Sequence, residues 1–248
     1  MAKGVRADQL LVEQGLAESR SRAQALILAG LVFAGDQRVD KPGTSIRPDS
    51  PLSLRGRDHP WVSRGGVKLA HALEALGWDI AGSVAIDVGA STGGFTDVLL
   101  TRGAARIYAV DVGHGQLAWK LRSDPRVIVL ERTNARHLTA AEIPEPVDLI
   151  TCDASFIALE KVLATPLGFA KPAARLVALI KPQFEAGRAE VGKGGVVRDP
   201  AVHERVCREV AEWIGRQPGW QAELIERSPI TGPEGNVEFL LGAIRTAA

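Results

Sequence analysis

An apolar run followed by a glycine-rich turn, over residues 84–95, constrains the fold of this chain more than any other stretch. The run Val-Ala-Ile-Asp-Val leads directly into a short turn that contains Gly89, Gly93 and Gly94. A buried parallel strand has this composition where it enters a loop whose backbone can touch a ligand. We therefore expect a nucleotide-like ligand at the carboxyl end of this strand.

The rest of the chain after residue 66 alternates between helical and strand patterns. Such alternation predicts a parallel sheet with helices on both faces. No helix separates the last two strands, which should pair as an antiparallel hairpin at one edge. We expect strands over 83–88, 106–110, 127–130, 147–152, 176–180, 221–226 and 237–244, with helices over 67–76, 95–102 and 200–216.

Composition fits a globular α/β protein with one large domain, or a small domain and a large one. The chain has 248 residues, of which 46% are apolar and 24% are charged. Residues 1–64 hold ten basic and seven acidic side chains, a modest excess that a solvated surface explains as well as nucleic acid does.

Cysteine usage and hydropathy exclude several classes of protein. Cys152 and Cys207 are too few for a disulfide framework or a zinc site, so we expect packed thiols and no metal. The first residues lack the apolar core of a signal peptide, and no apolar stretch is long enough to cross a bilayer. These features favour a cytoplasmic location without a membrane partner.

The first 58 residues predict a small α/β module. One helix is expected over 6–14 and a second after Ser19 or Ser21, followed by a strand, a Gly-Asp turn and another strand. The pattern resembles the S4 RNA-binding domain, through Arg6-Ala-Asp-Gln-Leu-Leu, Gly15-Leu-Ala, Ser19-Arg-Ser-Arg-Ala, Ile27, Gly30, Val32, Gly35 and Val39.

Arginines at the start of the second helix could grip phosphates, and the lack of aromatic residues favours recognition of folded RNA shape. The alternative is a cap that only stabilises the large domain. The candidate RNA-binding residues are Arg6, Arg20, Arg22 and Arg64.

A linker is expected over residues 59–66, between the module at 1–58 and a large domain at 67–248. Glycines and a proline break regular structure between residues 55 and 66. Trp61 and Val62 are expected to dock one domain on the other, and a solvent-exposed hinge is the alternative.

The large domain resembles the Rossmann-like S-adenosylmethionine-dependent methyltransferases, whose seven-stranded sheet ends in such a hairpin. Its loop reads Asp-x-Gly-x-x-x-Gly, whereas the loop that cradles a pyrophosphate reads Gly-x-Gly-x-x-Gly. Asp111 could accept both ribose hydroxyls or cap a helix, and Asn134 could border the adenine or serve a turn. The candidate cofactor-binding residues are Asp87, Gly89, Ser91, Gly93, Gly94, Phe95, Asp111 and Asn134.

Charged residues end three strands that are neighbours in the methyltransferase order 3-2-1-4-5-7-6. Asp153, Lys181 and Glu238 would then lie at one rim, about 4.8 Å apart from strand to strand. Each alone could be a solvated loop charge. With Lys68 they resemble the Lys-Asp-Lys-Glu tetrad of the FtsJ-like ribose 2′-O-methyltransferases, which makes these four the candidate catalytic residues.

The tetrad combined with an S4 module resembles the TlyA family, which methylates cytidine ribose 2′-oxygens in ribosomal RNA. That resemblance implies a ribosomal subunit as partner, the large one and in some members also the small one, and we expect a monomer. The matching motifs are Trp61-Val-Ser-Arg-Gly-Gly, the 87–96 loop, Asp111-Val-Gly-His-Gly-Gln-Leu-Ala-Trp, Glu131-Arg-Thr-Asn-Ala-Arg, Asp153-x-Ser-Phe-Ile, Lys181-Pro-Gln-Phe-Glu, Gly194-Gly-Val-Val-x-Asp-Pro and Gly235-Asn-Val-Glu.

Lys181 has two candidate roles. It could remove the ribose proton if a useful fraction is neutral, which its acidic neighbours oppose, or it could stay charged and orient the hydroxyl. The glycine-rich segment 187–195 is expected to be a flap over the substrate or an ordinary loop. Phe156 and Phe184 could contact the target base or belong to the core.

The residues leave three alternative functions to be considered. The chain could be a non-catalytic RNA-binding factor for ribosome assembly. A nicotinamide oxidoreductase is disfavoured by the loop spacing and the final hairpin. A haemolysin, a label attached to this family, is disfavoured because no long apolar segment or basic amphipathic helix stands out.

Overall fold

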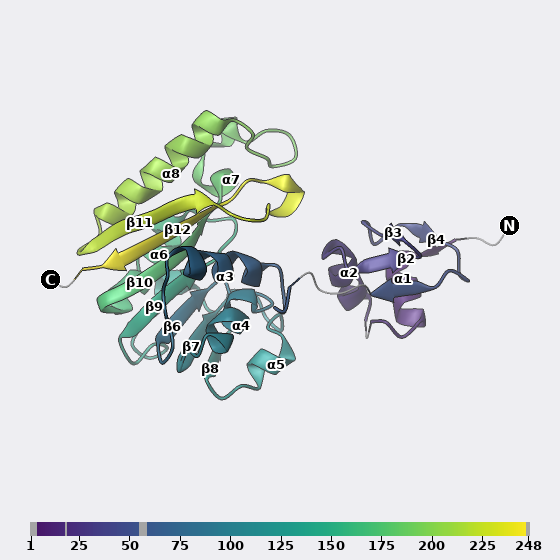
Figure 1. Ribbon diagram of the computed structural model, residues 1–248, viewed down its shortest axis with the longest axis horizontal. Coiled ribbons are helices and arrows are strands. Elements are labelled where there is room, and N and C mark those ends of the chain that lie inside the picture. The colour runs from purple at the N-terminus through teal and green to yellow at the C-terminus, as the bar shows by residue number, and fades with distance from the viewer. Residues whose placement is uncertain (1–3, 18, 55–58, 247–248) are drawn as a thin grey trace. The chain divides into compact units, whose positions relative to one another are not determined.

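The computed structural model describes residues 4–17, 19–54 and 59–246, which form two compact units, Met1–Pro60 and Trp61–Ala248 (Figure 1). Residues 55–58, the end of the expected small module and directly before the expected linker, lie outside the described part of the chain. The two units are described separately.

The small unit consists of two helices and short antiparallel strands. Ser19 is the N-cap of the second helix, because its hydroxyl accepts the backbone N–H of Arg22 at 3.2 Å. Leu10, Leu11 and Ile27 are buried in its core, whereas Leu28 is 70% exposed. The elements are β1 (Val5–Arg6), α1 (Ala7–Glu13), α2 (Arg20–Leu28), β2 (Val32–Ala34), β3 (Gln37–Arg38), β4 (Ser45–Ile46) and β5 (Leu52–Leu54).

The large unit contains a seven-stranded sheet in the order β11-β12-β10-β9-β6-β7-β8. This order is the predicted 3-2-1-4-5-7-6, and β12 pairs antiparallel with both β10 and β11, so the expected fold and its hairpin edge are confirmed. The strands are β6 (Val84–Val88), β7 (Arg106–Val110), β8 (Val127–Leu130), β9 (Val147–Cys152), β10 (Ala170–Ile180), β11 (Trp220–Arg227) and β12 (Phe239–Arg245).

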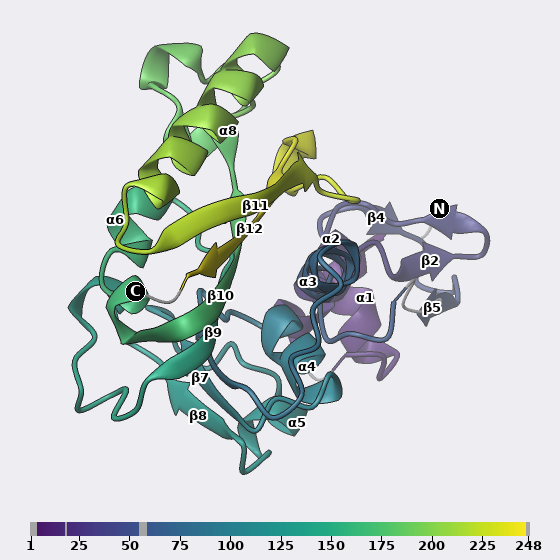
Figure 2. The same cartoon turned by 60° about the vertical axis from the view of Figure 1, so that its left-hand side comes forward.

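Helices cover both faces of this sheet, and a separate apolar core lies on each face. Figure 2 shows α3 (Gly65–Ala75) and α4 (Gly94–Thr101) on one side, and α8 (Pro200–Gly215) and α6 (Leu159–Leu163) on the other. Leu69 and Leu99 belong to the first core, and Leu163 and Ile214 belong to the second. The sheet is therefore buried on both faces, as its apolar strands predict.

Part of the expected linker belongs to the large unit. Helix α3 begins at Gly65, two residues before the expected start, and Trp61 and Val62 pack against the core beside α3 and α4. A Cβ added to Gly66 would lie 2.3 Å from Cγ of Trp61, so only glycine allows this contact. The Val62 N–H donates to Asp97 Oδ2 at 2.8 Å and fixes the entry into α3.

The glycine-rich segment after β10 is more ordered than a plain loop. It contains α7 (Pro182–Glu185), a 3₁₀ turn over Arg188–Glu190 and a β-bridge between Gly192 and Val196. Asn236 holds the base of this bridge: its Oδ1 accepts from the Val197 N–H at 3.3 Å, and its Nδ2 donates to the Gly195 carbonyl at 3.1 Å. The short helix α5 (Trp119–Arg122) lies between β7 and β8 in the sequence.

Both cysteines are free thiols in the interior. Burial raises the pKa of Cys152 to about 12 and that of Cys207 to about 11, which makes them poor nucleophiles. Within residues 4–17, 19–54 and 59–246, no helix is long and apolar enough to cross a membrane. The same ranges hold no group of three or more His, Cys, Asp or Glu placed to bind a metal ion.

Candidate active site

Four charged side chains from distant parts of the sequence meet at one edge of the sheet. Lys68 Nζ lies 2.5 Å from Glu238 Oε2 and 3.8 Å from Asp153 Oδ2, and Lys181 Nζ lies 2.6 Å from Asp153 Oδ1. The chain of ion pairs therefore runs Glu238–Lys68–Asp153–Lys181 with alternating sign. The predicted convergence of these four residues is observed.

The sheet topology explains this convergence. Asp153 directly follows β9 and Lys181 directly follows β10, two parallel neighbours. Because β12 runs antiparallel to β10, with Phe239 opposite Ile180, Glu238 at the start of β12 comes beside the end of β10. Lys68 reaches the same edge from the first turn of α3.

The Glu238 carboxylate is almost completely buried. The residue is 1% exposed, and a Cβ added to Gly232 would lie 2.1 Å from its Oε1. Oε1 finds no hydrogen-bond donor among the described residues, while Oε2 contacts Lys68. A buried carboxylate oxygen without a donor is energetically costly, so stability alone does not explain why Glu238 is present.

Three oxygens surround the Lys181 amine. In addition to the Asp153 carboxylate, Nζ donates to the Asp153 carbonyl at 3.2 Å and to Ser155 Oγ at 3.0 Å. The Lys181 side chain is only 7% exposed. The amine therefore makes two hydrogen bonds, to the Asp153 carbonyl and the Ser155 hydroxyl, and one close ion pair, with the Asp153 carboxylate.

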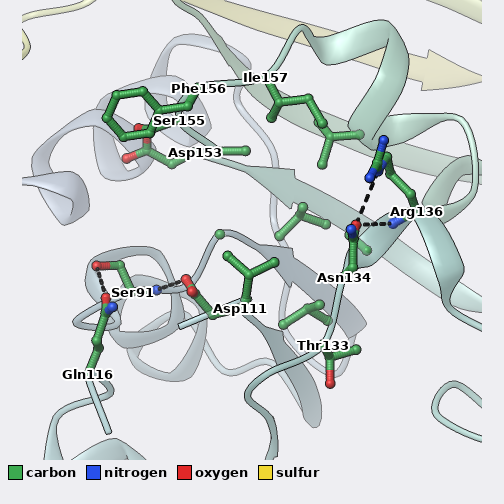
Figure 3. Close-up of a pocket in the computed structure, with 17 residues that line it drawn as sticks. Ser91, Asp111, Gln116, Thr133, Asn134, Arg136, Asp153, Ser155, Phe156 and Ile157 are labelled. Carbon is green, nitrogen blue, oxygen red and sulfur yellow. Dashed lines mark hydrogen bonds between the residues drawn. The ribbon is translucent and has the colours of Figure 1, made fainter. Parts of the chain in front are cut away.

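A cavity of about 440 Å³ opens beside this cluster, at the carboxyl ends of β6, β7 and β9 (Figure 3). Polar groups line it from several segments, and Val88, Val110, Ile157 and Val162 give it an apolar wall. This size and mixture are typical of small-molecule sites. The predicted residues that line it are Gly89, Ser91, Asp111, Asn134 and Asp153.

Asp111 lies at the centre of the cavity rim, directly after β7. Its Oδ2 accepts the Ser91 N–H at 2.8 Å, and its Oδ1 accepts the Gly113 N–H at 2.6 Å. Ser91 has a φ of 48°, a left-handed backbone that few non-glycine residues adopt, and its hydroxyl donates to Gln116 Oε1 at 3.1 Å. The carboxylate thus fastens the glycine-rich loop to the loop after β7, and each oxygen keeps lone pairs for a ligand.

A second acid holds the far side of the loop after β7. Glu131 accepts the Gly115 N–H and pairs with Arg122 and His114, and the Gly115 bond is the largest cause that lowers its pKa to about 2. Its side chain is 11% exposed. The loop that carries Asp111 is therefore fixed at both ends.

Four predicted cofactor-binding residues do not line this cavity. Asp87 is fully buried between Thr96 Oγ1 at 2.6 Å and Thr151 Oγ1 at 3.0 Å, and burial raises its pKa to about 6. Phe95 lies in the core between the sheet and α3. Gly93 and Gly94 are required by packing, because an added Cβ would lie 2.2 Å from Leu121 and 2.3 Å from Ser63.

Gly89 both lines the cavity and is required by packing. It lines the cavity, has a φ of 79°, and packs on the backbone of Ala154, which an added Cβ would approach to 3.0 Å. Four polar residues that were not predicted also line the cavity: Gln116, Thr133, Arg136 and Ser155. The motifs 111–119, 131–136 and 153–157 contain all four and could have identified them.

Phe156 is not a core residue. It is 90% exposed, has a φ of 65°, and its ring centroid lies 5.0 Å from that of Phe184. The core alternative for Phe156 is therefore wrong. An exposed aromatic ring on a left-handed backbone at the mouth of a cavity is typical of a functional site.

The candidate RNA-binding arginines differ in their surroundings. Arg6 and Arg20 both contact the buried Asp8 carboxylate, at 2.9 and 3.2 Å, and Arg6 is the main cause that holds the pKa of Asp8 well below its ordinary value. Arg22 is exposed at the start of α2. Arg64, in the large unit, donates to the Thr231 carbonyl at 3.3 Å.

The sheet order, the final hairpin and the cavity at the carboxyl ends of the strands define an S-adenosylmethionine-dependent methyltransferase. The chain belongs to the FtsJ-like methyltransferase family, whose sequence model matches residues 61–245, and residues 5–50 match the S4 domain. The nicotinamide oxidoreductase alternative is therefore wrong.

Comparison with individual proteins gives the same family. The chain is 49% identical to the 16S/23S rRNA (cytidine-2′-O)-methyltransferase TlyA of Mycobacterium tuberculosis, over 97% of this chain and 90% of that protein. It is 38% identical to Hemolysin A of Brachyspira hyodysenteriae, over 95% of this chain and 98% of that protein. A solved structure from Streptococcus thermophilus, described provisionally as a hemolysin, has a TM-score of 0.76 and 39% identity, and the match covers 100% of this chain and 90% of that one.

Proposed function

We propose that this protein transfers a methyl group from S-adenosylmethionine to the ribose 2′-oxygen of a cytidine in ribosomal RNA. The observation that carries the proposal is the alternating cluster of Lys68, Asp153, Lys181 and Glu238 at the edge of the cavity. The similarity to a relative whose name states this activity supports the choice of cytidine and ribosomal RNA.

The cavity residues fit the methyl donor. Asp111 offers carboxylate lone pairs to the ribose hydroxyls, Gly89 gives access to the backbone, and Ile157 and Asn134 provide a mixed wall for the adenine. When bound, the sulfonium supplies an activated methyl group that needs no metal ion.

The charged cluster would prepare the nucleophile. The fixed amine of Lys181 would orient the 2′-hydroxyl, and its three oxygen contacts support this orienting role. Asp153 holds Lys181 and Lys68 in place, and Glu238 holds Lys68 from the other side. Placement of the oxygen in line with the methyl group would provide much of the acceleration.

RNA recognition would involve both units. The S4 domain would grip folded RNA through Arg22 and the arginines around Asp8, and Phe156 would contact the target base from the mouth of the cavity. Arg64 would add a charge on the large unit. A ribosomal RNA partner supports a cytoplasmic location, where we expect the protein to act as a monomer.

The direct test measures methyl transfer from radiolabelled S-adenosylmethionine to purified large and small ribosomal subunits, followed by mapping of 2′-O-methyl groups. Label on a cytidine ribose supports the proposal. RNA binding without transfer would instead indicate a ribosome-assembly factor. Lysis of erythrocytes without transfer would favour the activity named for the hemolysin relative.

A further inference from the structure

The loop over residues 153–157 is held unusually firmly for a connection between a strand and a helix. At its start, the Asp153 N–H donates to the Val88 carbonyl at 3.0 Å, and Ala154 packs directly on Gly89. Just beyond its end, the Leu159 N–H donates to Glu185 Oε1 at 2.8 Å. The loop is therefore fastened both to β6 and to the turn that follows Lys181.

The backbone strain of this loop lies next to Ser155. Phe156 adopts a φ of 65°, a left-handed conformation that is unfavourable for a residue with a side chain. The Phe156 ring is 90% exposed, while the preceding Ser155 hydroxyl accepts a hydrogen bond from the Lys181 amine at 3.0 Å. Strain that persists in a well-anchored loop indicates that a side chain is held in a required place.

Ser155 differs from the other contacts of Lys181. Of the two residues that surround Nζ, Asp153 is partly buried and supplies both a carboxylate and a carbonyl, whereas Ser155 is exposed and supplies only a hydroxyl. Both line the cavity, so the hydroxyl lies between a nearly buried amine and the space for the reactants.

We propose that Ser155 is a positioning residue, whose hydroxyl accepts one N–H of Lys181 and thereby aims the amine at the attacking ribose oxygen. This inference rests on the proposed function. Without the hydroxyl, the contacts of the amine with the described residues are reduced to the Asp153 carboxylate and carbonyl, so its direction is less restrained. Misplacement of a catalytic group by about 1 Å is enough to lower the rate by about a hundredfold.

The test compares Ser155→Ala, Ser155→Thr and the control Ser123→Ala, which removes a hydroxyl that bonds only within its own helix end. For Ser155→Ala we expect kcat on ribosomal subunits to fall by roughly tenfold to a hundredfold, with KM for RNA changed by less than about twofold. Ser155→Thr should restore most of kcat, and Ser123→Ala should behave as wild type.

A measurement without RNA separates this inference from the proposed function. Acylation of Lys181 by an N-hydroxysuccinimide ester, followed by peptide mass spectrometry, should be several-fold faster in Ser155→Ala than in wild type or Ser155→Thr. Equal acylation rates, an unchanged kcat, or failure of threonine to restore kcat would overturn the role of Ser155. A wild-type protein that methylates no RNA refutes the proposed function alone, because the acylation rates still decide whether Ser155 holds the amine.

Discussion

Lys181 is the last residue in the chain of ion pairs that begins at Glu238. Its amine contacts a carboxylate, a carbonyl and a hydroxyl within 3.2 Å, and its side chain is 7% exposed. We expect Lys181→Ala to lower kcat by about a thousandfold, because the hydroxyl loses the group that orients it. Kd for S-adenosylmethionine should stay within about threefold, since Lys181 does not line the cavity.

The control for this variant is Lys171→Ala. Lys171 lies at the opposite end of the same strand and pairs with Asp148. It should retain the wild-type kcat and unfold at nearly the same urea concentration. Near-normal turnover by Lys181→Ala, measured as radiolabel transferred to ribosomal subunits, would remove Lys181 from the mechanism.

Asp111 lines the cavity and is the proposed contact for the ribose of S-adenosylmethionine. Asp111→Asn keeps the shape but weakens both acceptor positions and offers an N–H where the Ser91 and Gly113 N–H groups donate. We expect Kd for S-adenosylmethionine to rise by roughly tenfold to a hundredfold, or about 1.4 to 2.7 kcal/mol. Isothermal titration calorimetry measures this change, and an unaltered Kd would exclude Asp111 as a contact of the ribose.

At the scale of elements, the final hairpin was predictable because no helix separates its two strands, whereas the strand order followed from the resemblance to the methyltransferases. The same reasoning brought Asp153, Lys181 and Glu238 to one edge. The direction of the Asp87 side chain was not predictable, because its partners Thr96 and Thr151 lie on other elements that only the folded sheet brings near. Ser155 was missed for the same reason: its contact with Lys181 spans two strand ends.

Glu185, in the short helix α7 directly after Lys181, is expected to make the stability of the protein depend on pH. Burial raises the pKa of this carboxyl from 4.5 to about 7, while Oε1 accepts the Leu159 N–H. Between these two pH values the folded state holds a proton that the unfolded state releases, so the free energy of unfolding falls as pH rises from about 4.5 to 7. The largest loss expected from this shift is about 3 kcal/mol.

Glu185→Gln tests this element because it keeps an acceptor for the Leu159 N–H and removes the titration. Asp87, whose pKa is also raised, should contribute equally to both proteins and cancel in the comparison. Urea unfolding at pH 5 and pH 7.5 should therefore show a smaller decrease in stability for the variant than for wild type. Identical decreases in the two proteins would mean that Glu185 titrates normally.

At the scale of the whole molecule, the two groups of candidate residues lie mainly in different compact units. The cavity and the charge cluster lie within Trp61–Ala248, whereas three candidate RNA-binding arginines lie within Met1–Pro60. Arg6 and Arg20 are held by Asp8, so their substitution would also disturb the fold of the small unit. Arg22 is exposed and its backbone N–H makes the cap bond, which makes its side chain the cleaner probe.

Arg22→Ala should weaken RNA binding without changing the cofactor site. Loss of one phosphate contact should lower affinity for ribosomal RNA uniformly and reduce the slope of log K against log salt by about 1. Arg47→Ala is the matched control, because Arg47 is an exposed arginine of the same unit that pairs with Asp49 at 2.8 Å. Filter binding at several salt concentrations measures both variants, with calorimetry of S-adenosylmethionine in parallel. A salt slope for Arg22→Ala equal to that of Arg47→Ala would indicate that the start of α2 does not touch the RNA backbone.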